Sequence, residues 1–427
     1  MGKKPIIAII VSLLILTTAV VFVTTDLYSP DIEDKQSEDQ NQNPLGNITS
    51  FNDAVNQFCF DFFKKLAEDE NNHPNIFYSP YSVFTALAMT YEGARNNTAE
   101  EMKNVLHIEQ DNDSFHNYMQ SLYNHLNYND KYTISTANAL WPDLGFNLLD
   151  EYVNIIETYY GGKATEVEYA NPEEAARIIN EWVEKQTNNL IKNLVPPDKI
   201  DPDLTKLILT NAIYFKGIWQ VQFDEVNTTK RDFNLASGEL TQVDTMKMTG
   251  TKDKFNYTET DKFQILELPY NGKDISMIII LPKEGVELSE IISEINREDY
   301  ISWIESMDEK ELDIYLPKFK FETKYTLNDY LYDMGMKDAF TYDADFSGID
   351  GKPDLFISSV LHKAFIEVNE EGTEAAAATA VIMNLKAVNG NESSRIVFDA
   401  DHPFLFTIHH KETNTILFIG NVENPLE

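Results

Sequence analysis

One short segment near the C-terminal end constrains the fold more than any other part of this 427-residue chain. It reads Glu-Glu-Gly-Thr-Glu-Ala-Ala-Ala-Ala-Thr-Ala from Glu370 to Ala380. Four consecutive alanines favour a helix by intrinsic propensity, and propensity alone leaves that alternative open. The surroundings favour a strand, because residues 354–402 contain no proline. Between Thr373 and Val388 the only charged side chains are Glu374 and Lys386.

As a strand, this segment has two faces of different character. Glu374 lies on one face, and the other carries only small or apolar side chains, those of Thr373, Ala375, Ala377, Thr379, Val381 and Met383. A proline would remove a hydrogen bond of the ladder, and a bulky residue would not fit between packed strands. The sequence therefore predicts a segment that can become an internal strand of a sheet.

The N-terminus carries an apolar run from Ile6 to Val23 behind two lysines, about the length needed to cross a bilayer. No Ala-x-Ala cleavage site follows it, so we expect residues 1–25 to be an uncleaved signal-anchor, with a cleaved signal peptide as the alternative. The acidic, polar residues 26–47 are expected to form a disordered tether. Both alternatives place the folded body, residues 48–427, outside the cell, either secreted or anchored to the outer face of the membrane.

Asn-x-Ser/Thr acceptors are consistent with an exported glycoprotein, although chance produces several in an Asn-rich sequence. They occur at Asn47, Asn96, Asn112, Asn227, Asn256 and Asn391.

The pattern of the body is that of an α+β fold in one domain. Helical periodicity dominates the first part of the body, at 51–67, 80–92, 98–106, 114–127, 148–160 and 172–193. Strand-like apolar runs dominate later, at Leu207–Phe215, Ile275–Leu281, Leu312–Leu316, Phe365–Val368, Phe404–Ile408 and Ile416–Ile419. Helices first and strands later favour antiparallel or mixed sheets.

The sequence gives no sign of catalysis, of a cofactor or of a metal site. Common motifs for nucleophiles, zinc sites and phosphate-binding loops are missing. Adjacent His409 and His410 should point to opposite faces of a strand, which disfavours joint metal binding. Cys59 is the only cysteine, so no internal disulfide forms, and its helical context predicts a packed thiol. A net charge of −36 disfavours nucleic acid as a partner.

The segment from Glu370 to Ala380 resembles the reactive-loop hinge of inhibitory serpins, the serine protease inhibitor family. Five further motifs, in order along residues 51–427, strengthen the resemblance: Asn75-Ile-Phe-Tyr-Ser-Pro-Tyr-Ser82, Thr210-Asn-Ala-Ile-Tyr-Phe-Lys-Gly217, Leu316-Pro-Lys-Phe319, Gly335 to Phe346, and Phe398-Asp-Ala-Asp-His-Pro-Phe404. The resemblance implies three β-sheets and about nine helices in one domain, with an exposed reactive-centre loop.

The resemblance also implies a mechanism in which the protein is the substrate and the protease supplies the catalytic residues. The protease cuts the loop and forms an acyl-enzyme, and the loop then inserts into the central sheet and distorts the protease. Family spacing puts the scissile bond fourteen residues after Gly372, between Lys386 and Ala387. A lysine there favours a trypsin-like target. The chain from Lys386 to Pro403 is several residues longer than is usual in the family, which leaves bonds after Asn384 and Leu385 open.

The hinge itself corresponds to Glu370, Glu371, Gly372, Thr373, Glu374, Ala375, Ala376, Ala377, Ala378, Thr379 and Ala380. Other residues match family positions beneath and beside the central sheet. Ser79, Ser82, Asn211 and His362 match a polar cluster that must rearrange when the strands part. Trp219 matches an aromatic residue where the loop first inserts, and Lys318 matches an ionic partner of Glu370. Taken singly, each could be an ordinary capping, core or surface residue.

The resemblance implies a monomer whose partner is a serine-type protease, with a cysteine protease as the other target class. The alternative function is that of a non-inhibitory serpin-fold carrier or chaperone. The small side chains from Thr373 to Ala380 favour inhibition, because the hinge of a non-inhibitory member usually carries bulky, charged or proline residues.

Overall fold

The computed structural model describes residues 48–69, 74–109, 112–127, 131–373 and 395–427. The N-terminal apolar run, the acidic tether, hinge residues Glu374 to Ala380 and the Lys386–Ala387 bond lie outside these residues. Within the described part of the chain, no helix combines the length and hydrophobicity needed to span a membrane.

Ten α-helices occur in the described residues, against about nine expected: α1 (Ile48–Ala67), α2 (Pro80–Gly93), α3 (Asn96–Val105), α4 (Asn112–Asn127), α5 (Asp150–Tyr160), α6 (Pro172–Gln186), α7 (Leu288–Glu294), α8 (Arg297–Glu305), α9 (Asn328–Met334) and α10 (Ser347–Asp350). The predicted helix over 172–193 is too long at its C-terminal end. Asn188 and Asn189 adopt positive φ angles, which a right-handed helix does not allow, so α6 ends at Gln186.

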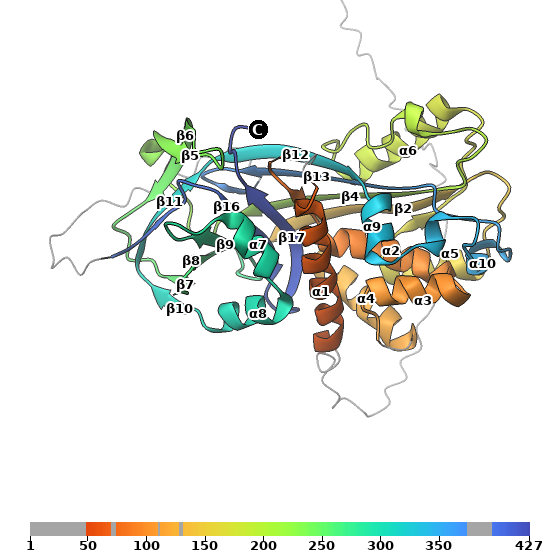
Figure 1. Ribbon diagram of the computed structural model, residues 1–427, viewed down its shortest axis with the longest axis horizontal. Helices are drawn as coiled ribbons and strands as arrows, with labels where there is room; N and C mark the ends of the chain where they lie inside the picture. Colours follow the sequence, from red (N-terminus) through yellow and green to blue (C-terminus); the bar gives the residue numbers. More distant parts are fainter. Residues whose placement is uncertain (1–47, 70–73, 110–111, 128–130, 374–394) are drawn as a thin grey trace, which may run out of the picture. The chain divides into compact units, whose positions relative to one another are not determined.

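A six-stranded sheet forms the centre of the fold, in the order β12-β13-β14-β4-β2-β3. Its strands are β2 (Tyr132–Pro142), β3 (Lys163–Ala164), β4 (Leu207–Ile218), β12 (Phe319–Thr326), β13 (Ser359–Val368) and β14 (Gly372–Thr373). The long strands run side by side across the molecule, with α6 on one side and α1, α2 and α9 on the other (Figure 1).

Two further sheets complete the three that were expected. The seven-stranded sheet has the order β1-β17-β16-β9-β8-β7-β10 and the four-stranded sheet the order β15-β11-β6-β5. The first contains β1 (Phe77–Tyr78), β7 (Phe255–Glu259), β8 (Phe263–Pro269), β9 (Ile275–Pro282), β10 (Asp308–Lys310), β16 (Phe404–His410) and β17 (Thr415–Val422). The second contains β5 (Thr229–Asn234), β6 (Leu240–Met248), β11 (Leu312–Pro317) and β15 (Ile396–Asp399). The predicted α+β class and the three-sheet architecture are confirmed.

Alternation along the central strands divides the apolar side chains between two cores. In β4, Leu209 and Ile213 belong to the main core, whereas Ile208 and Ala212 belong to a smaller cluster beneath α6. Side chains that succeed one another along a strand point to opposite faces, so one strand supplies both cores. The central sheet is therefore covered on both faces.

Candidate functional site

The two middle strands of the central sheet, β13 and β4, are paired at one end and separated at the other. They pair in parallel from Ser359 opposite Ile208 to Ala364 opposite Ile213. Beyond that point β14 lies between them and pairs antiparallel with both. A gap for an additional strand is therefore already open at one end of the sheet, and the first hinge residues occupy it.

Gly372 sits so close to β4 that it has no room for a side chain. A Cβ atom built at this position would lie 2.0 Å from the Gly217 carbonyl oxygen, and its φ angle is +155°. Backbone atoms cannot move aside as a flexible side chain could. The hinge glycine is therefore required by the close approach of β14 to β4.

Trp219 and Tyr270 hold the seated part of the hinge. Their rings stack with centroids 4.4 Å apart, and Trp219 is 3% exposed. The Trp219 indole N–H donates to the Asn369 carbonyl oxygen at 2.9 Å, and its backbone N–H donates to the Glu371 carbonyl oxygen at 2.9 Å. The Tyr270 hydroxyl lies 2.5 Å from the Thr373 hydroxyl. Thr373 is thus anchored on the side of the sheet that faces the main core.

Glu370 anchors the start of the hinge through two hydrogen bonds. Lys318 Nζ lies 2.8 Å from Glu370 Oε2, and the Thr228 hydroxyl donates to Oε1 at 2.7 Å. Burial by itself would raise the pKa of this carboxyl, but the bonds from Lys318 and Thr228 hold it below its usual value. The carboxylate is therefore charged at neutral pH and paired.

The four predicted polar residues beneath the sheet form one hydrogen-bonded cluster. His362 on β13 lies directly opposite Asn211 on β4, and His362 Nδ1 bonds to Asn211 Oδ1. Asn211 Nδ2 donates to Ser82 Oγ at 2.5 Å. Ser79 caps α2 by accepting from the Ser82 N–H at 3.1 Å, and its own hydroxyl donates to the Leu417 carbonyl oxygen. A strand inserted between β13 and β4 would separate His362 from Asn211.

The cluster requires a neutral imidazole. His362 Nε2 accepts from the Ser79 N–H at 3.3 Å, so the ring proton is on Nδ1. Burial lowers the pKa of His362 to about 3. Protonation of Nε2 would cost the bond to Ser79 and leave a buried charge.

Four residues of this site were missed by the sequence reasoning. Asn138 on β2 lies opposite Asn211 and accepts from both Ser82 and Asn211 through its side-chain oxygen. Tyr270, Thr228 and Asn369 hold the hinge, as described above. Asn138, Thr228 and Tyr270 reach the site through contacts between segments distant in sequence, so no local motif marks them, whereas Asn369 directly precedes the hinge.

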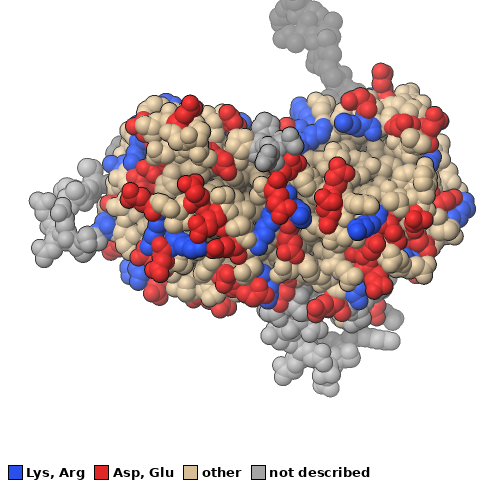
Figure 2. Space-filling view, viewed as in Figure 1, with Lys and Arg blue, Asp and Glu red and all other residues tan. Residues whose placement is uncertain are grey.

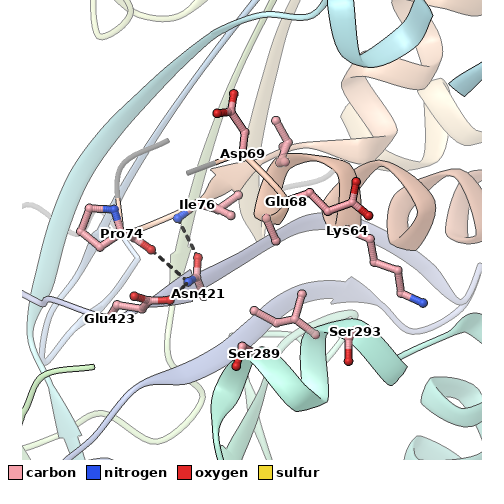
Figure 3. Close-up of a pocket in the computed structure, with 12 residues that line it drawn as sticks. Lys64, Glu68, Asp69, Pro74, Ile76, Ser289, Ser293, Asn421 and Glu423 are labelled. Atoms are coloured by element: carbon pink, nitrogen blue, oxygen red, sulfur yellow. Dashed lines mark hydrogen bonds between the residues drawn. The ribbon is translucent and has the colours of Figure 1, made fainter. Parts of the chain in front are cut away.

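A pocket of about 300 Å³ lies away from the central strands, at the C-terminal end of α1 (Figure 3). Its wall includes Lys64 from α1, Glu68 directly after that helix, Ser293 from α7, and Asn421 and Glu423 near the end of the chain. Burial raises the pKa of Glu423. None of the residues predicted for the site lines this pocket. Within the described residues, no group of three or more His, Cys, Asp or Glu side chains is arranged to hold a metal ion.

Comparisons with known proteins agree with this geometry. The family model for serpins, serine protease inhibitors, matches residues 53–425. An uncharacterised serpin-like protein of Thermococcus kodakarensis is 45% identical over 87% of this chain and 85% of its own. Human Serpin B3 is 39% identical over 88% of this chain and all of its own.

A solved structure of similar fold is that of Serpin48, described as a highly specific serpin in the insect Tenebrio molitor. It has a TM-score of 0.79 and 35% identity, covering 88% of this chain and 98% of its own. The matches extend over nearly all of the described residues, including the central sheet and the seated hinge. The chain therefore belongs to the serpin family.

Proposed function

We propose that this protein traps a trypsin-like serine protease through cleavage after Lys386, followed by insertion of the loop as a strand between β13 and β4. One observation carries the proposal: Gly372 and Thr373 already occupy the open end of the gap between these strands as β14. The protein acts as an inhibitor and not as an enzyme.

The register of β14 supports full insertion of the segment that follows. Thr373 lies opposite Val368 of β13 and Gly217 of β4. If the antiparallel register continues, Thr379 comes to lie between His362 and Asn211. Its hydroxyl can then donate and accept hydrogen bonds where the bond between those two side chains has been broken. The hydrogen bond between His362 and Asn211 would thus be replaced by hydrogen bonds from each of them to Thr379.

The target class follows from the residue at the cleaved bond. A specificity pocket with an acidic residue at its bottom binds a lysine side chain, whereas an apolar pocket rejects it. The high negative charge of the chain favours a cationic partner surface and disfavours nucleic acid. Figure 2 shows Asp and Glu side chains spread over the whole face in view.

Incubation of the residue 48–427 body with trypsin tests the proposal. We expect a covalent complex that survives boiling in detergent, and a released C-terminal fragment that begins at Ala387. Lys386→Ala should abolish the complex with trypsin, whereas Lys386→Arg should retain it. A fragment with another N-terminus would move the scissile bond, and complexes only with a cysteine protease would change the target class.

The alternative function, a carrier or chaperone without trapping, predicts that the loop is cut and the protease is released active. The small hinge residues and the seated β14 support trapping over this alternative. Protease recovered fully active from every incubation would favour the carrier.

The location of the protein is a separate proposal, drawn from the sequence of residues 1–25. We infer export, with the apolar run retained as an anchor on the outer face of the membrane. Sequencing the mature N-terminus tests the anchor. A terminus between Thr24 and Asn47 would mean that the protein is secreted.

A further inference from the structure

The pocket at the C-terminal end of α1 lies between segments that are distant in sequence (Figure 3). Its volume of about 300 Å³ is at the lower end of the usual range for small-molecule sites. Four apolar residues from α1, from the segment before β1 and from α7 contribute to its wall: Leu66, Ala67, Ile76 and Ile292. Such sites combine an apolar wall with a few fixed polar groups that select the ligand. The polar groups of this wall therefore decide which chemical class of molecule fits.

The Glu423 carboxylate is held at a fixed position of the wall, directly after β17. Its Oε1 accepts a hydrogen bond from Asn421 Nδ2 at 3.1 Å, and the same amide group donates to the Pro74 carbonyl oxygen at 3.0 Å. The backbone N–H of Glu423 donates to Asn75 Oδ1 at 2.8 Å. These bonds join the end of β17 to the segment before β1. A carboxylate that is already in place loses little conformational freedom when a ligand binds.

Two of the three carboxylates on the wall have partners within the protein. Lys65 Nζ lies 2.7 Å from Glu68 Oε2, and the Tyr330 hydroxyl donates to Asp69 Oδ2 at 2.6 Å. Glu423 differs from them, because among the residues that the structure describes no Lys, Arg or His side chain lies within ion-pair distance of it. Burial raises the pKa of Glu423, because it disfavours the charged form. A cation bound in the pocket would supply the missing positive charge.

The one lysine on the wall stands apart from Glu423. Figure 3 shows Lys64 and Glu423 at opposite ends of the lining residues, and Ile76 lies between them in this view. Lys64 follows Asp61 by one helical turn on α1, so that carboxylate offsets its charge. The pocket is therefore anionic at the end formed by Glu423 and apolar beside it.

We propose that this pocket binds a small organic cation, an amine with an apolar body. The ammonium group donates hydrogen bonds to the Glu423 carboxylate, and the apolar body packs on Ile76 and Ile292. A hydrogen bond between two charged groups is stronger than a neutral one, so an uncharged molecule of the same shape binds more weakly. An anion of that shape is repelled by the same carboxylate. The pocket lies away from the central strands, so this binding does not depend on the proposed inhibition.

Titration of the full-length protein with phenethylamine, followed by saturation-transfer NMR near neutral pH, tests the proposal. We expect saturable binding with a dissociation constant of about 1 mM or below, because a ligand this small makes few contacts. Phenethyl alcohol, which has a hydroxyl in place of the ammonium group, should bind at least about tenfold more weakly. Phenylpropionate, an anion, should bind more weakly still. No saturable binding of the amine, or equal binding of the alcohol or the anion, would overturn the proposal.

Glu423→Gln removes the charge and keeps the shape of the side chain. The glutamine oxygen can still accept from Asn421 Nδ2, so the end of β17 keeps its hydrogen bonds. We expect the amine to bind at least about tenfold more weakly and the alcohol to bind as before. Glu239→Gln is the matched control, because it makes the same change on an exposed glutamate directly before β6. It should bind the amine like the wild type, which excludes general attraction by a chain with a net charge of −36.

Ser293→Leu tests the location of the site independently of charge. Ser293 lines the pocket from the exposed side of α7, so a leucine there fills space that the apolar body of the ligand needs. Amine binding should be lost, whereas Ser302→Leu, the same change on an exposed serine of α8 outside the pocket, should leave it unchanged.

The two variants of the pocket together decide the proposal. Weaker amine binding in both Glu423→Gln and Ser293→Leu, with both controls unchanged, supports it. An unchanged affinity for the amine in Glu423→Gln would overturn it, whatever the result for Ser293→Leu, because the carboxylate would then not recognise the cation. None of these measurements involves a protease, so failure of the proposed inhibition and failure of amine binding are seen separately.

Discussion

Gly372 shows how a single residue fixes the position of the hinge. Its neighbour Trp219 donates its backbone N–H to the Glu371 carbonyl oxygen, so the exchange of that amide reports whether the hinge is seated. Gly372→Ala should displace β14, because the new methyl group would clash with the Gly217 carbonyl oxygen. Backbone strain of about 1–3 kcal/mol corresponds to at least about fivefold faster exchange of the Trp219 amide.

A matched control separates the effect of the clash from the effect of replacing a glycine that has a positive φ angle. Gly238 also has a positive φ angle, +83°, but a Cβ atom there meets nothing within 4 Å. Gly238→Ala should leave the exchange of the Trp219 amide unchanged. Equal exchange rates in Gly372→Ala and the wild type would show that the seated hinge tolerates a side chain.

At the scale of the element, the polar cluster is a product of strand register. His362, Asn211 and Asn138 come from three neighbouring strands and lie directly opposite one another. Asn138→Ala would leave the Asn211 amide and the Ser82 hydroxyl without a shared acceptor. An unsatisfied buried polar group costs about 1–3 kcal/mol, so the free energy of unfolding in urea should fall by about that amount.

The control for this variant lies on the same strand. Ser135 on β2 is only partly buried, and its hydroxyl accepts one long contact, 3.5 Å, from Asn188. Ser135→Ala should change the free energy of unfolding by less than about 0.5 kcal/mol. Equal losses in the two variants would mean that the cluster contributes no specific stabilisation.

The same scale shows what the sequence could predict and why. Strands β9 and β17 are buried at every position, and the apolar residues that make up most of each strand are visible in the sequence without any partner. Strand β12 alternates buried and exposed residues along its length, so its period-two signal was available although it was not among the predicted strands. The two-residue strands β1, β3 and β14 have no periodicity of their own, because only their neighbours define them.

The candidate site likewise contains residues that the sequence could identify and residues that only contacts between strands define. Its hinge and polar residues were found by resemblance to family motifs, since a lone Ser79 or His362 carries no functional signal. Asn138 and Tyr270 were missed, because their roles depend on cross-strand contacts. The end of α6 was placed too late, because apolar periodicity continues beyond Gln186 while the backbone turns at the asparagines that follow.

At the scale of the whole molecule, buried histidines in two sheets make folding sensitive to acid. Burial lowers the pKa of His362 and His410 to about 3 and that of His409 to about 4. The unfolded chain binds these protons near pH 6.5, so it holds more protons than the native state between about pH 6.5 and 4. The free energy of unfolding should therefore decrease as the pH is lowered across that window, by up to about 1.4 kcal/mol per pH unit for each ring.

Comparing unfolding in urea at pH 7, 6 and 5 measures this slope. His410→Gln removes one titrating ring and should reduce the slope by up to about 1.4 kcal/mol per pH unit. His402 acts in the opposite direction, because its pKa is raised, and its contribution is lost as the pH rises. An unchanged slope in His410→Gln would show that this ring does not stay neutral in the folded protein.

The last prediction concerns the trap as a whole, because inhibition depends on how fast the cut loop inserts. Continued from β14, the register puts Ala377 between Ala364 of β13 and Ile213 of β4, which are both fully buried on the main-core side. In Ala377→Glu, insertion would bury a carboxylate without a partner, at a cost of several kcal/mol. Every ~1.4 kcal/mol added to the barrier slows insertion about tenfold.

Deacylation should then overtake insertion, so Ala377→Glu should be cleaved at the wild-type rate while releasing active trypsin. Ala376→Glu is the matched control, because it places the same carboxylate on the opposite face beside half-buried Phe365, where Lys320 Nζ lies 5.5 Å from the ring. The ratio of detergent-stable complex to cleaved inhibitor measures the outcome, and it should fall much further in Ala377→Glu than in the control. Unchanged complex formation in Ala377→Glu would mean that the loop does not enter the sheet in this register, because a buried, unpaired carboxylate cannot be accommodated at that position without slowing insertion.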